Sequence, residues 1–501
     1  AHLQAAEFLY ETRLFPEPEY TFKHALTHEV AYNSLLLERR RGLHARLVEA
    51  LEALAPERVA EQVERLAHHA LRGEVWDKAV TYCQQAGNRA YDRAAFHEAV
   101  AAFEQALQAL AHLPEPGDTR MLAIELRLAL ERPLRALGEY GRRRALLGEA
   151  EALARVLDDR AWLGRVLAQM ADALRMTGDS DGAVAAGQQA LELSAALGDS
   201  ALQGQAFYFL GQTYFAIGDF GRAAELLRWN VETADRESGT PRADLRILSQ
   251  AWLARTLSAL GAFVEGRRHG EEALRLATMA GRGDAPIMAH GWLGTLYLAQ
   301  GDLEHAIRLL EPGLALCRAS GNRDYFRAIA AGLGYASALQ GRLAEGRALL
   351  EEAISEGIRT GALLGQAYRV AWLSEVCRLE GRSDEAWQHA RQALDLARQQ
   401  KARGDEALAL YQLGVVQAHA NPSDATQAEA HYQQALALAD ELGMRPLQAH
   451  CHLGLGRLYG QTGRGEQARA ALATAIDLYR AMDMTFWLPQ AEAALAQVEG
   501  R

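Results

Sequence analysis

Residues that break helices and residues that favour strands are both scarce in this sequence. Proline occurs 12 times in 501 residues, and aromatic residues make up only 7% of the chain. Alanine, leucine, glutamine, glutamate and arginine, which favour helices, dominate the rest, so the composition predicts an all-α fold. Hydrophobic residues make up 49% and charged residues 23%, which is an ordinary globular composition and argues against a largely disordered chain.

Cysteines and lysines are too few and too scattered for several kinds of site. Cys83, Cys317, Cys377 and Cys451 lie 60 or more residues apart and form no C-x-x-C pair, which predicts reduced thiols and a cytoplasmic protein. None of the three lysines completes a G-x-x-x-x-G-K-[ST] loop. This chain therefore cannot hydrolyse ATP by that mechanism.

Long apolar runs and a positive net charge are also missing. No run approaches the roughly 18 residues that span a bilayer, and Glu7 and Glu11 are out of place in a secretion signal. The 53 basic and 64 acidic residues give a net charge of −11, which disfavours contact with nucleic acids and acidic membranes. We expect neither a membrane nor a nucleic acid to be a direct partner.

Glycine, in contrast, recurs with a period of about 40 residues. Glycine or asparagine suits the position just after a helix, where the backbone turns into the left-handed region, so each member of the series predicts a helix end. Ala94 and Gly73 extend the pattern toward the N-terminus. A first series is Gly138, Gly178, Gly218, Gly261, Gly301, Gly341, Gly381, Asn421 and Gly463. A second series, about 20 residues after the first, is Gly198, Gly239, Gly281, Gly321, Gly361 and Gly443.

Small and large apolar residues keep fixed positions around each glycine of the first series. Gly211 and Tyr214 precede Gly218, and Ala223 and Leu227 follow it; the same frame recurs around the glycines at 301 and 463. Small residues let two antiparallel helices approach closely, and large residues fill the space that they leave. A single hairpin cannot bury such a face, so the pattern predicts stacked helical hairpins.

These residues resemble the tetratricopeptide repeat, whose pattern places an aromatic residue, Leu-Gly, Tyr and then Ala at such offsets. The resemblance implies a right-handed α-α superhelix of about nine or ten hairpins over residues 56–501. The period of about 40 exceeds the common 34, as in the longer repeats of bacterial signalling ATPases and transcription activators.

Residues 20–51, YTFKHALTHEVAYNSLLLERRRGLHARLVEAL, carry a second resemblance. The string is similar to the stretch that joins the ATPase region to the repeats in large bacterial proteins that combine a nucleotide cyclase domain, a STAND-type ATPase and a tetratricopeptide array. The resemblance covers residues 1–115 closely. It implies that residues 1–55 form a helical connector, and that the catalytic domains lie upstream, outside this chain.

No motif for catalysis, a metal or a cofactor stands out. His24 and His28 lie four residues apart, but a zinc protease motif needs Glu directly after the first His, and Ala25 stands there. The glycines at 454, 456 and 460 occupy repeat positions and follow no predicted strand, so they do not form a dinucleotide-binding turn. We therefore expect no catalytic residue, no metal site and no cofactor.

The concave side of the array is the best candidate for a binding surface. In tetratricopeptide arrays the first helix of each pair lines this side, and the resemblance assigns mainly arginines and tyrosines to it. Such a set suits an acidic peptide or protein segment, because guanidinium groups bind carboxylates in bidentate fashion and tyrosines offer rigid contact area. The alternative is that these arginines pair with acids of neighbouring helices. The set comprises Arg132, Arg135, Arg165, Asp172, Arg175, Tyr208, Gln212, Arg255, Tyr335, Tyr368, Glu375, Arg378 and Arg457.

The sequence thus favours a non-catalytic module for protein interaction and regulation. It would form the C-terminal arm of a larger bacterial signalling ATPase or nucleotide cyclase, with a protein or peptide partner and the upstream domains as its contacts. One alternative is the effector-sensing domain of an ATP-dependent transcription activator, and a more remote one is an enzyme in its own right. The sequence that flanks this chain in the intact protein distinguishes the first two.

Overall fold

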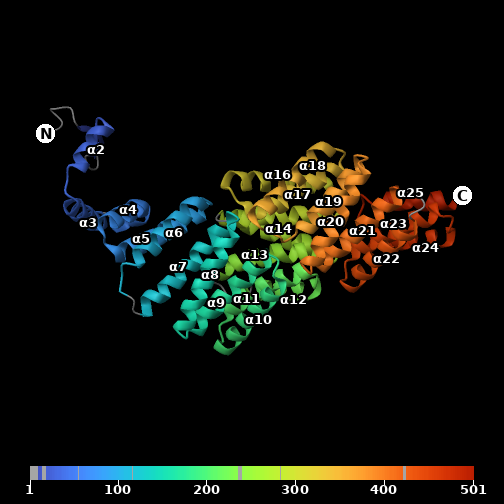
Figure 1. Cartoon of the computed structure of the whole chain (residues 1–501), viewed down its shortest axis with the longest axis horizontal. Coiled ribbons are helices and arrows are strands. Elements are labelled where there is room, and N and C mark those ends of the chain that lie inside the picture. The colour runs from blue at the N-terminus through green and yellow to red at the C-terminus, as the bar shows by residue number, and fades with distance from the viewer. Residues whose placement is uncertain are drawn as a thin grey trace. The chain divides into compact units, whose positions relative to one another are not determined.

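The computed structural model describes residues 9–13, 19–54, 56–114, 117–234, 240–281, 284–420 and 425–500 (Figure 1). The chain divides into two compact units. The first comprises Ala1–Arg89 and Ala101–Thr119, and the second comprises Ala90–Val100 and Arg120–Arg501. The predicted connector of residues 1–55 and array of residues 56–501 stay a prediction.

The first unit begins with a feature that the sequence analysis did not foresee. Strands β1 (Leu9–Arg13) and β2 (Glu19–Phe22) pair in antiparallel fashion, with Leu9 opposite Phe22. The β2 segment is Glu-Tyr-Thr-Phe, and its aromatic and β-branched residues favour a strand. His24 follows with an extended backbone before the helix that contains His28, so the two histidines do not share a helix as predicted. The helical elements of this part are α2 (Ala25–Asn33), α3 (Leu37–Leu54), η1 (Pro56–Gln62), α4 (Val63–Gly73), α5 (Trp76–Asp92) and α6 (Phe96–Leu110).

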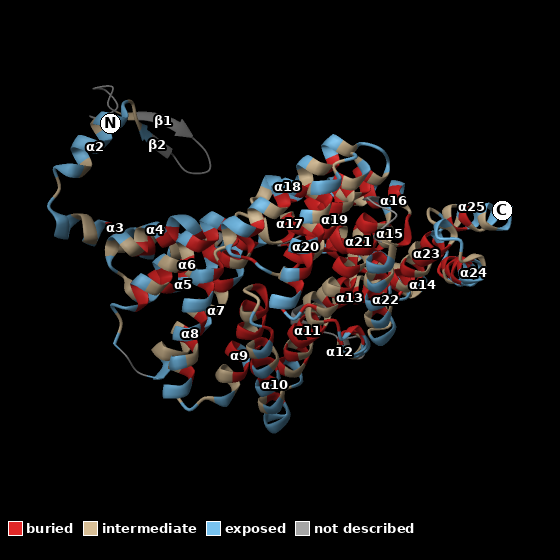
Figure 2. Ribbon diagram, turned by 45° about the vertical axis from the view of Figure 1, so that its right-hand side comes forward, coloured by how far each residue is buried: buried red, intermediate tan, exposed pale blue. Residues whose placement is uncertain are grey.

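In the second unit, antiparallel helices follow one another in regular pairs, and their facing sides are buried (Figure 2). No helix of the described residues is long and apolar enough to cross a membrane. The first helices of the pairs are α7 (Gly117–Ala136), α9 (Arg160–Met176), α11 (Ser200–Ile217), α13 (Thr240–Ala259), α15 (Ala285–Gln300), α17 (Arg323–Leu339), α19 (Gln366–Leu379), α21 (Arg403–Ala420) and α23 (Arg445–Gln461). The second helices are α8 (Tyr140–Val156), α10 (Ser180–Leu197), α12 (Phe220–Ala234), α14 (Phe263–Ala280), α16 (Leu303–Ser320), α18 (Leu343–Thr360), α20 (Ser383–Gln399), α22 (Ala425–Glu441) and α24 (Gly465–Ala481), with α25 (Leu488–Glu499) at the end.

The predicted helix ends are confirmed wherever the structure describes them. Every described glycine of the two series has a positive φ, between +56° and +93°. Ala94, predicted to replace a turn glycine, has φ +57°, whereas the turn predicted at Gly73 falls one residue later, at Glu74. Gly239 and Asn421 lie outside the described residues. Three turns without glycine, which the sequence analysis missed, complete the second series at Asp158, Lys401 and Asp483.

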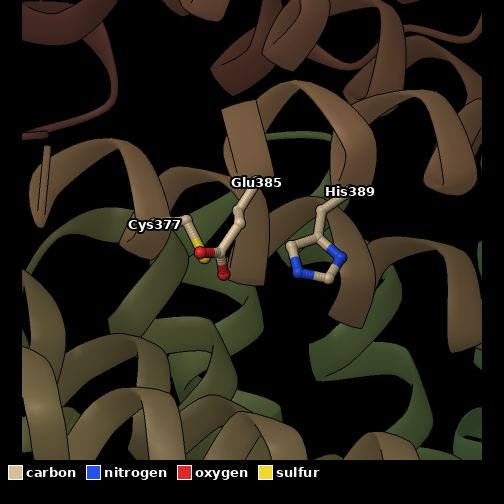
Figure 3. A group of neighbouring side chains, drawn as sticks. All are labelled: Cys377, Glu385 and His389. Carbon is tan, nitrogen blue, oxygen red and sulfur yellow. The ribbon is translucent and has the colours of Figure 1, made fainter. Parts of the chain in front are cut away.

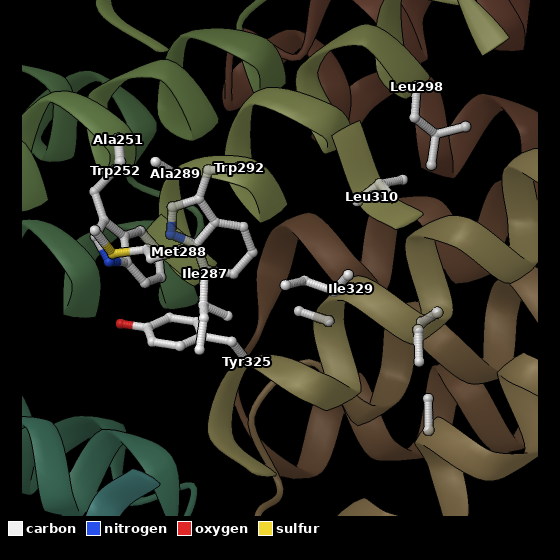
Figure 4. Close-up of a cluster of buried hydrophobic side chains, with 14 of the residues drawn as sticks. Ala251, Trp252, Ile287, Met288, Ala289, Trp292, Leu298, Leu310, Tyr325 and Ile329 are labelled. Atoms are coloured by element: carbon white, nitrogen blue, oxygen red, sulfur yellow. The ribbon is translucent and has the colours of Figure 1, made fainter. Parts of the chain in front are cut away.

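Close approach of paired helices explains the fixed small and large positions. A Cβ atom on Gly211 would lie 2.9 Å from Cγ of Leu227, and one on Gly294 would lie 2.7 Å from Cγ of Leu310. Both contacts are too short for alanine without a shift of the neighbouring leucine. Stacked pairs then share one core, in which Trp252, Trp292 and other apolar side chains lie together (Figure 4). The predicted all-α solenoid of hairpins is therefore confirmed.

Within the second unit, turns far apart in sequence meet each other. The backbone N–H of Leu363 donates to the carbonyl oxygen of Met176 at 3.1 Å. Nζ of Lys401 donates to Asp181 at 2.5 Å. The partners in the second pair lie 220 residues apart in sequence, which corresponds to about five and a half repeats per superhelical turn. We call the line of these contacts the seam. Along the seam, turns that follow first helices contact segments that precede first helices later in the chain. The turns are at Gly178, Gly218, Gly261 and Gly301, and the segments lie near residues 363, 404, 445 and 487.

Candidate functional site

A cavity of about 320 Å³ lies on the inner side of the second unit. Its lining comes mostly from the first helices of the hairpins, from α7 at one end to α23 at the other, and from the turns that follow them. The first helices were the ones that the tetratricopeptide resemblance assigned to the concave side. The structure therefore provides one enclosed inner surface on which side chains of many repeats converge.

The 40-residue period places the lining residues in two columns. One side chain per repeat recurs at the same position of successive first helices, because stacking keeps equivalent positions in line. The first column is Arg135, Arg175, Phe215, Arg255, Thr295, Tyr335 and Glu375. The second column is Gln212, Trp252, Trp292, Trp372 and Gln412.

At one end of the cavity the arginines are paired with buried acids. Nε of Arg143 donates to Glu131 at 2.6 Å, and its Nη2 lies 2.8 Å from Oδ2 of Asp172. Arg175 donates to the same aspartate and, at 2.9 Å, to Gln212. Although burial opposes ionisation, Arg175 and Arg143 hold the pKa of Asp172 well below its usual range. Arg175 therefore pairs with an acid of its own helix, whereas the alternative had placed the acid on a neighbouring helix.

A second paired cluster joins α7 and α8 to α15 and α17. Nη2 of Arg135 donates to Asp284 at 2.7 Å. Asp324 accepts from the hydroxyl of Tyr140 at 2.8 Å, and Arg327 donates to the same hydroxyl at 2.7 Å. Burial together with the negative charge of Asp324 raises the pKa of Tyr140 above its usual range, so the phenol stays neutral. This cluster fixes two arginines at the cavity wall, with their charge already balanced by carboxylates.

The opposite wall is acidic and aromatic. Glu375 accepts hydrogen bonds from the hydroxyl of Tyr335 at 2.9 Å and from Gln412 at 2.7 Å. The ring of Tyr335 stacks on Trp372, with centroids 4.8 Å apart and planes 3° from parallel. His450 contacts the ring of Trp487 nearby, and burial lowers the pKa of His450 to about 4, so this histidine is neutral at pH 7. Planar aromatic rings therefore line the cavity on this side.

Arg255 has a different environment from these paired arginines. Its guanidinium carbon lies 4.1 Å from the ring centroid of Trp292, 5.0 Å from that of Phe215, and just under 6 Å from those of Trp252 and Tyr368. Among the described residues no carboxylate forms an ion pair with it, and its Nε is buried without a hydrogen-bond partner. Arg255 thus presents a positive charge that no carboxylate of the described residues pairs with.

Arg369 and Asp405 complete this part of the wall. Arg369 is 2% exposed and donates to the hydroxyl of Tyr368 at 3.2 Å and to the carbonyl of Leu364 at 2.7 Å. Burial raises the pKa of Asp405 to about 6, while the charges of Arg255 and Arg369 act in the opposite direction. Neither arginine forms an ion pair with Asp405 within the described part of the chain, and all three residues line the cavity.

The thirteen residues predicted for the concave side fall into three groups. Seven line the cavity, and two, Asp172 and Tyr208, are buried just behind it. The remaining four are absent from the lining: Arg132 stacks on Tyr91, Arg165 on Trp162, Arg378 lies 3.7 Å from Glu375, and Arg457 donates to Gln490 at 3.4 Å. The seven lining residues are Arg135, Arg175, Gln212, Arg255, Tyr335, Tyr368 and Glu375.

The sequence analysis missed the tryptophans at 252, 292 and 372, and the charged residues Arg327, Arg369 and Asp405. The tryptophans stand at 40-residue steps from Gln212, which was chosen, so the period itself contained the signal. Arg369 and Asp405 lie on repeats that reach the cavity from the far side of the superhelix. No local pattern marks them.

A group of possible metal ligands lies outside the cavity lining. Cys377 on α19 and Glu385 and His389 on α20 place one ligand atom each within 4.8 Å of one another (Figure 3). Burial, with the nearby carboxylates, raises the pKa of the Cys377 thiol to about 11, and Glu385 already pairs with Arg382 at 2.5 Å. A metal ion would have to displace both a proton and an ion pair there. The prediction that the chain holds no metal stays a prediction.

Comparisons with known proteins identify the repeat. Residues 164–355 match the family model described as the MalT-like TPR region, and residues 423–481 match a tetratricopeptide repeat model. These segments are tetratricopeptide repeats, as the sequence resemblance implied. No curated protein sequence matches the chain.

Solved structures share the fold. A Rap protein complexed with competence and sporulation factor is similar, with a TM-score of 0.57 and 13% identity over 72% of this chain and 98% of that protein. A STAND protein with a tetratricopeptide repeat sensor from Pyrococcus horikoshii is 12% identical over 79% of this chain and 54% of its own length. Its TM-score is 0.38. The likeness to the Rap protein shows the fold.

Proposed function

We propose that this chain is a non-catalytic interaction and sensor module that binds a protein or peptide segment in its inner cavity. The observation that carries the proposal is the cavity itself, in which the rings of Trp252 and Trp292, at successive positions of one column, converge with Arg255, which forms no ion pair among the described residues. Aromatic and arginine side chains supply most of the binding energy at protein interfaces. The Rap protein of similar fold was solved with a bound factor, which is compatible with this use of a repeat array.

The module works as the regulatory arm of a larger protein. The segment at residues 20–51 resembles the junction between a STAND-type ATPase and its repeats, and we place the intact protein among bacterial signalling ATPases or nucleotide cyclases on that basis. Binding in the cavity would then bias the activity of upstream domains, because ligands shift conformational equilibria by their differential affinity. The four free cysteines, all buried, suit a cytoplasmic location.

The second candidate is the effector-sensing domain of an ATP-dependent transcription activator. The match of residues 164–355 to the MalT-like TPR region favours it. In that case the same cavity holds a small effector, and a DNA-binding domain belongs to the flanking sequence. A helix-turn-helix in the full open reading frame would decide for this candidate, and a cyclase domain would decide for the first.

Partner capture with cavity variants tests the proposed function. Trp372→Ala removes one face of the stacked pair with Tyr335 and widens the acidic wall, so we expect it to reduce recovery of the partner from an extract of the source cells. Arg457→Ala serves as the matched control, because Arg457 is exposed and outside the cavity. Circular dichroism and thermal unfolding of both variants check that the fold is intact. Equal partner recovery by both variants would refute binding in the cavity.

A further inference from the structure

We infer that Arg255 is the anchor for an anionic group, a carboxylate attached to a flat apolar body, and that this group identifies the ligand of the cavity. The inference rests on the proposed function for the location of the site. It adds the chemical class of the ligand and the residue that recognises it. Three features of the structure support it: the cage around Arg255, the missing acid, and the shape of the adjacent walls.

The cage explains how an unpaired arginine can be held in place. Four aromatic rings surround the guanidinium, and the shortest distance, 4.1 Å to Trp292, is a cation–π contact. These rings restrict the side chain without using its N–H groups, since the faces of aromatic rings offer no strong acceptor. The planar fork of donors therefore remains available for a bidentate bond to an oxyanion.

The balance of charge points in the same direction. Arg175, Arg135 and Arg327, which also line the cavity, have carboxylates within ion-pair distance. Arg255 and Arg369 have no carboxylate within ion-pair distance among the described residues, although both act electrostatically on Asp405, whose pKa burial raises to about 6. Arg255 is half-buried, and a charge removed from water without a partner is costly, so an arriving anion would replace solvent there.

Local structure holds the second arginine toward the same space. Gly365 has φ +68°, and a Cβ atom there would lie 2.4 Å from the Tyr368 ring and 3.2 Å from Nη1 of Arg369. Only glycine therefore allows the turn at the start of α19 to place the side chains of Tyr368 and Arg369 as they are. Nε of Arg369 is buried and has no hydrogen-bond partner among the described residues, and Arg369 lines the same cavity as Arg255.

The walls define what accompanies the anion. Trp252 and Trp292 contact each other with centroids 5.0 Å apart, and Tyr335 and Trp372 form a parallel stack across the lining. Flat rings next to a guanidinium favour an aromatic or otherwise planar group in the ligand. A volume of about 320 Å³ admits a short peptide end or a small acid.

Matched pairs of ligands test the inference directly. The probes are Ala-Ala-Ala-Phe with a free C-terminal carboxylate, the same peptide with a C-terminal amide, and 3-phenylpropionate as a small acid. Binding to the full chain is measured by titration calorimetry and by the fluorescence of the cavity tryptophans. We expect the free peptide to bind at least about tenfold more tightly than its amide, because only the carboxylate pairs with Arg255. Tight binding by 3-phenylpropionate as well would indicate that a free small acid is the source of the carboxylate.

Substitutions of Arg255 test whether this residue causes the preference for the carboxylate over the amide. Arg255→Met keeps an apolar side chain in the cage and should abolish the difference between acid and amide, while Arg457→Met, outside the cavity, should leave it unchanged. Arg255→Lys should restore part of the preference, since it retains the charge but not the fork. Equal affinity for acid and amide, an unchanged preference in Arg255→Met, or no binding of any probe at 10 mM, on the order of the weakest specific binding worth measuring, would overturn the inference.

The failure of this inference can be told apart from failure of the proposed function. If Arg255→Met keeps full partner recovery while Trp372→Ala loses it, the cavity is the binding site but the anchor is wrong. If Trp372→Ala also keeps full recovery, the cavity is not the site.

Discussion

Nη2 of Arg143 lies 2.8 Å from Oδ2 of Asp172, and neither side chain is exposed to solvent. The pair belongs to a buried network that ties α8 to α9 and, through Arg175, to α11. Charges of this kind are stable only as a set, because removal of one leaves its partners buried and uncompensated. The network therefore makes the rigidity of the cavity wall depend on one aspartate.

Asp172→Asn is expected to destabilise the protein by about 3–5 kcal/mol, since two buried arginines would lose their shared acid. Chemical denaturation at pH 7 measures the loss. Arg165→Ala, an exposed change one helix turn or more away on the same helix, should cost less than about 0.5 kcal/mol. Because the pKa of Asp172 is lowered, its contribution is present above pH 4 and is lost as the pH falls further, so the two proteins should converge in acid.

Asp405→Asn is expected to stabilise the protein above pH 7. The pKa of Asp405 is raised from 3.8 to about 6, so the folded state retains a proton that the unfolded state has released, and stability falls as the pH rises through 6. The variant removes this loss of folding stability. We expect the gain to be about 1–2 kcal/mol at pH 8, because the side chain faces the cavity. Thermal unfolding between pH 4 and 8 measures it, with the exposed Asp477→Asn as control. Parallel pH profiles for wild type and Asp405→Asn would contradict the assignment.

His69→Gln is expected to reduce the acid sensitivity of the first unit. Nδ1 of His69 lies 2.9 Å from Nδ1 of His44, and burial with neighbouring positive charges lowers the pKa of His69 to about 4. The unfolded chain takes up a proton near pH 6.5, whereas the folded histidine stays neutral, so stability is lost as the pH falls from 6.5 toward 4. Amide hydrogen exchange in α3 and α4 at pH 7 and pH 5 measures the change. The exposed His97→Gln should behave as wild type.

Gly301→Ala is expected to weaken the seam more than Gly341→Ala does. Both glycines have φ near +90°, so alanine costs about 1 kcal/mol of backbone strain at either position. A Cβ on Gly301 would also lie 2.7 Å from the ring of Trp487, whereas one on Gly341 would meet nothing within 4 Å. The difference in unfolding free energy between the two variants therefore isolates the contact between turns. Equal losses would mean that Trp487 moves aside freely.

Much of the local structure was predictable, for reasons that the turns illustrate. Glycine enters the left-handed region at little cost, so its period revealed where helices end. Asp158, Lys401 and Asp483 adopt the same conformation without being glycine, and only their place in the stacked array requires it of them. The strands at the N-terminus escaped notice because four or five residues of β-forming sequence are too short to outweigh a helical composition.

The candidate site was predictable only in part. Column positions such as Arg175, Arg255 and Tyr335 followed from the register of the repeat. The register of the repeat did not indicate which arginines form ion pairs, since Arg175 has an acid on its own helix and Arg255 pairs with none among the described residues. The acids that balance Arg135 are Asp284, 149 residues further along the chain, and Asp324, one repeat beyond it.

The sequence by itself determined the units of this protein, which are helices of defined length, paired and stacked, because helix ends and close contacts depend on residues that are near neighbours in the chain. Only the tertiary structure decided which turns meet across the seam, which charges cancel, and that Arg255 forms no ion pair within the part of the chain that the structure describes. Those outcomes depend on the small rotation between successive hairpins, which accumulates over about five and a half repeats before distant side chains come together. The sequence of a single repeat does not determine this accumulated rotation.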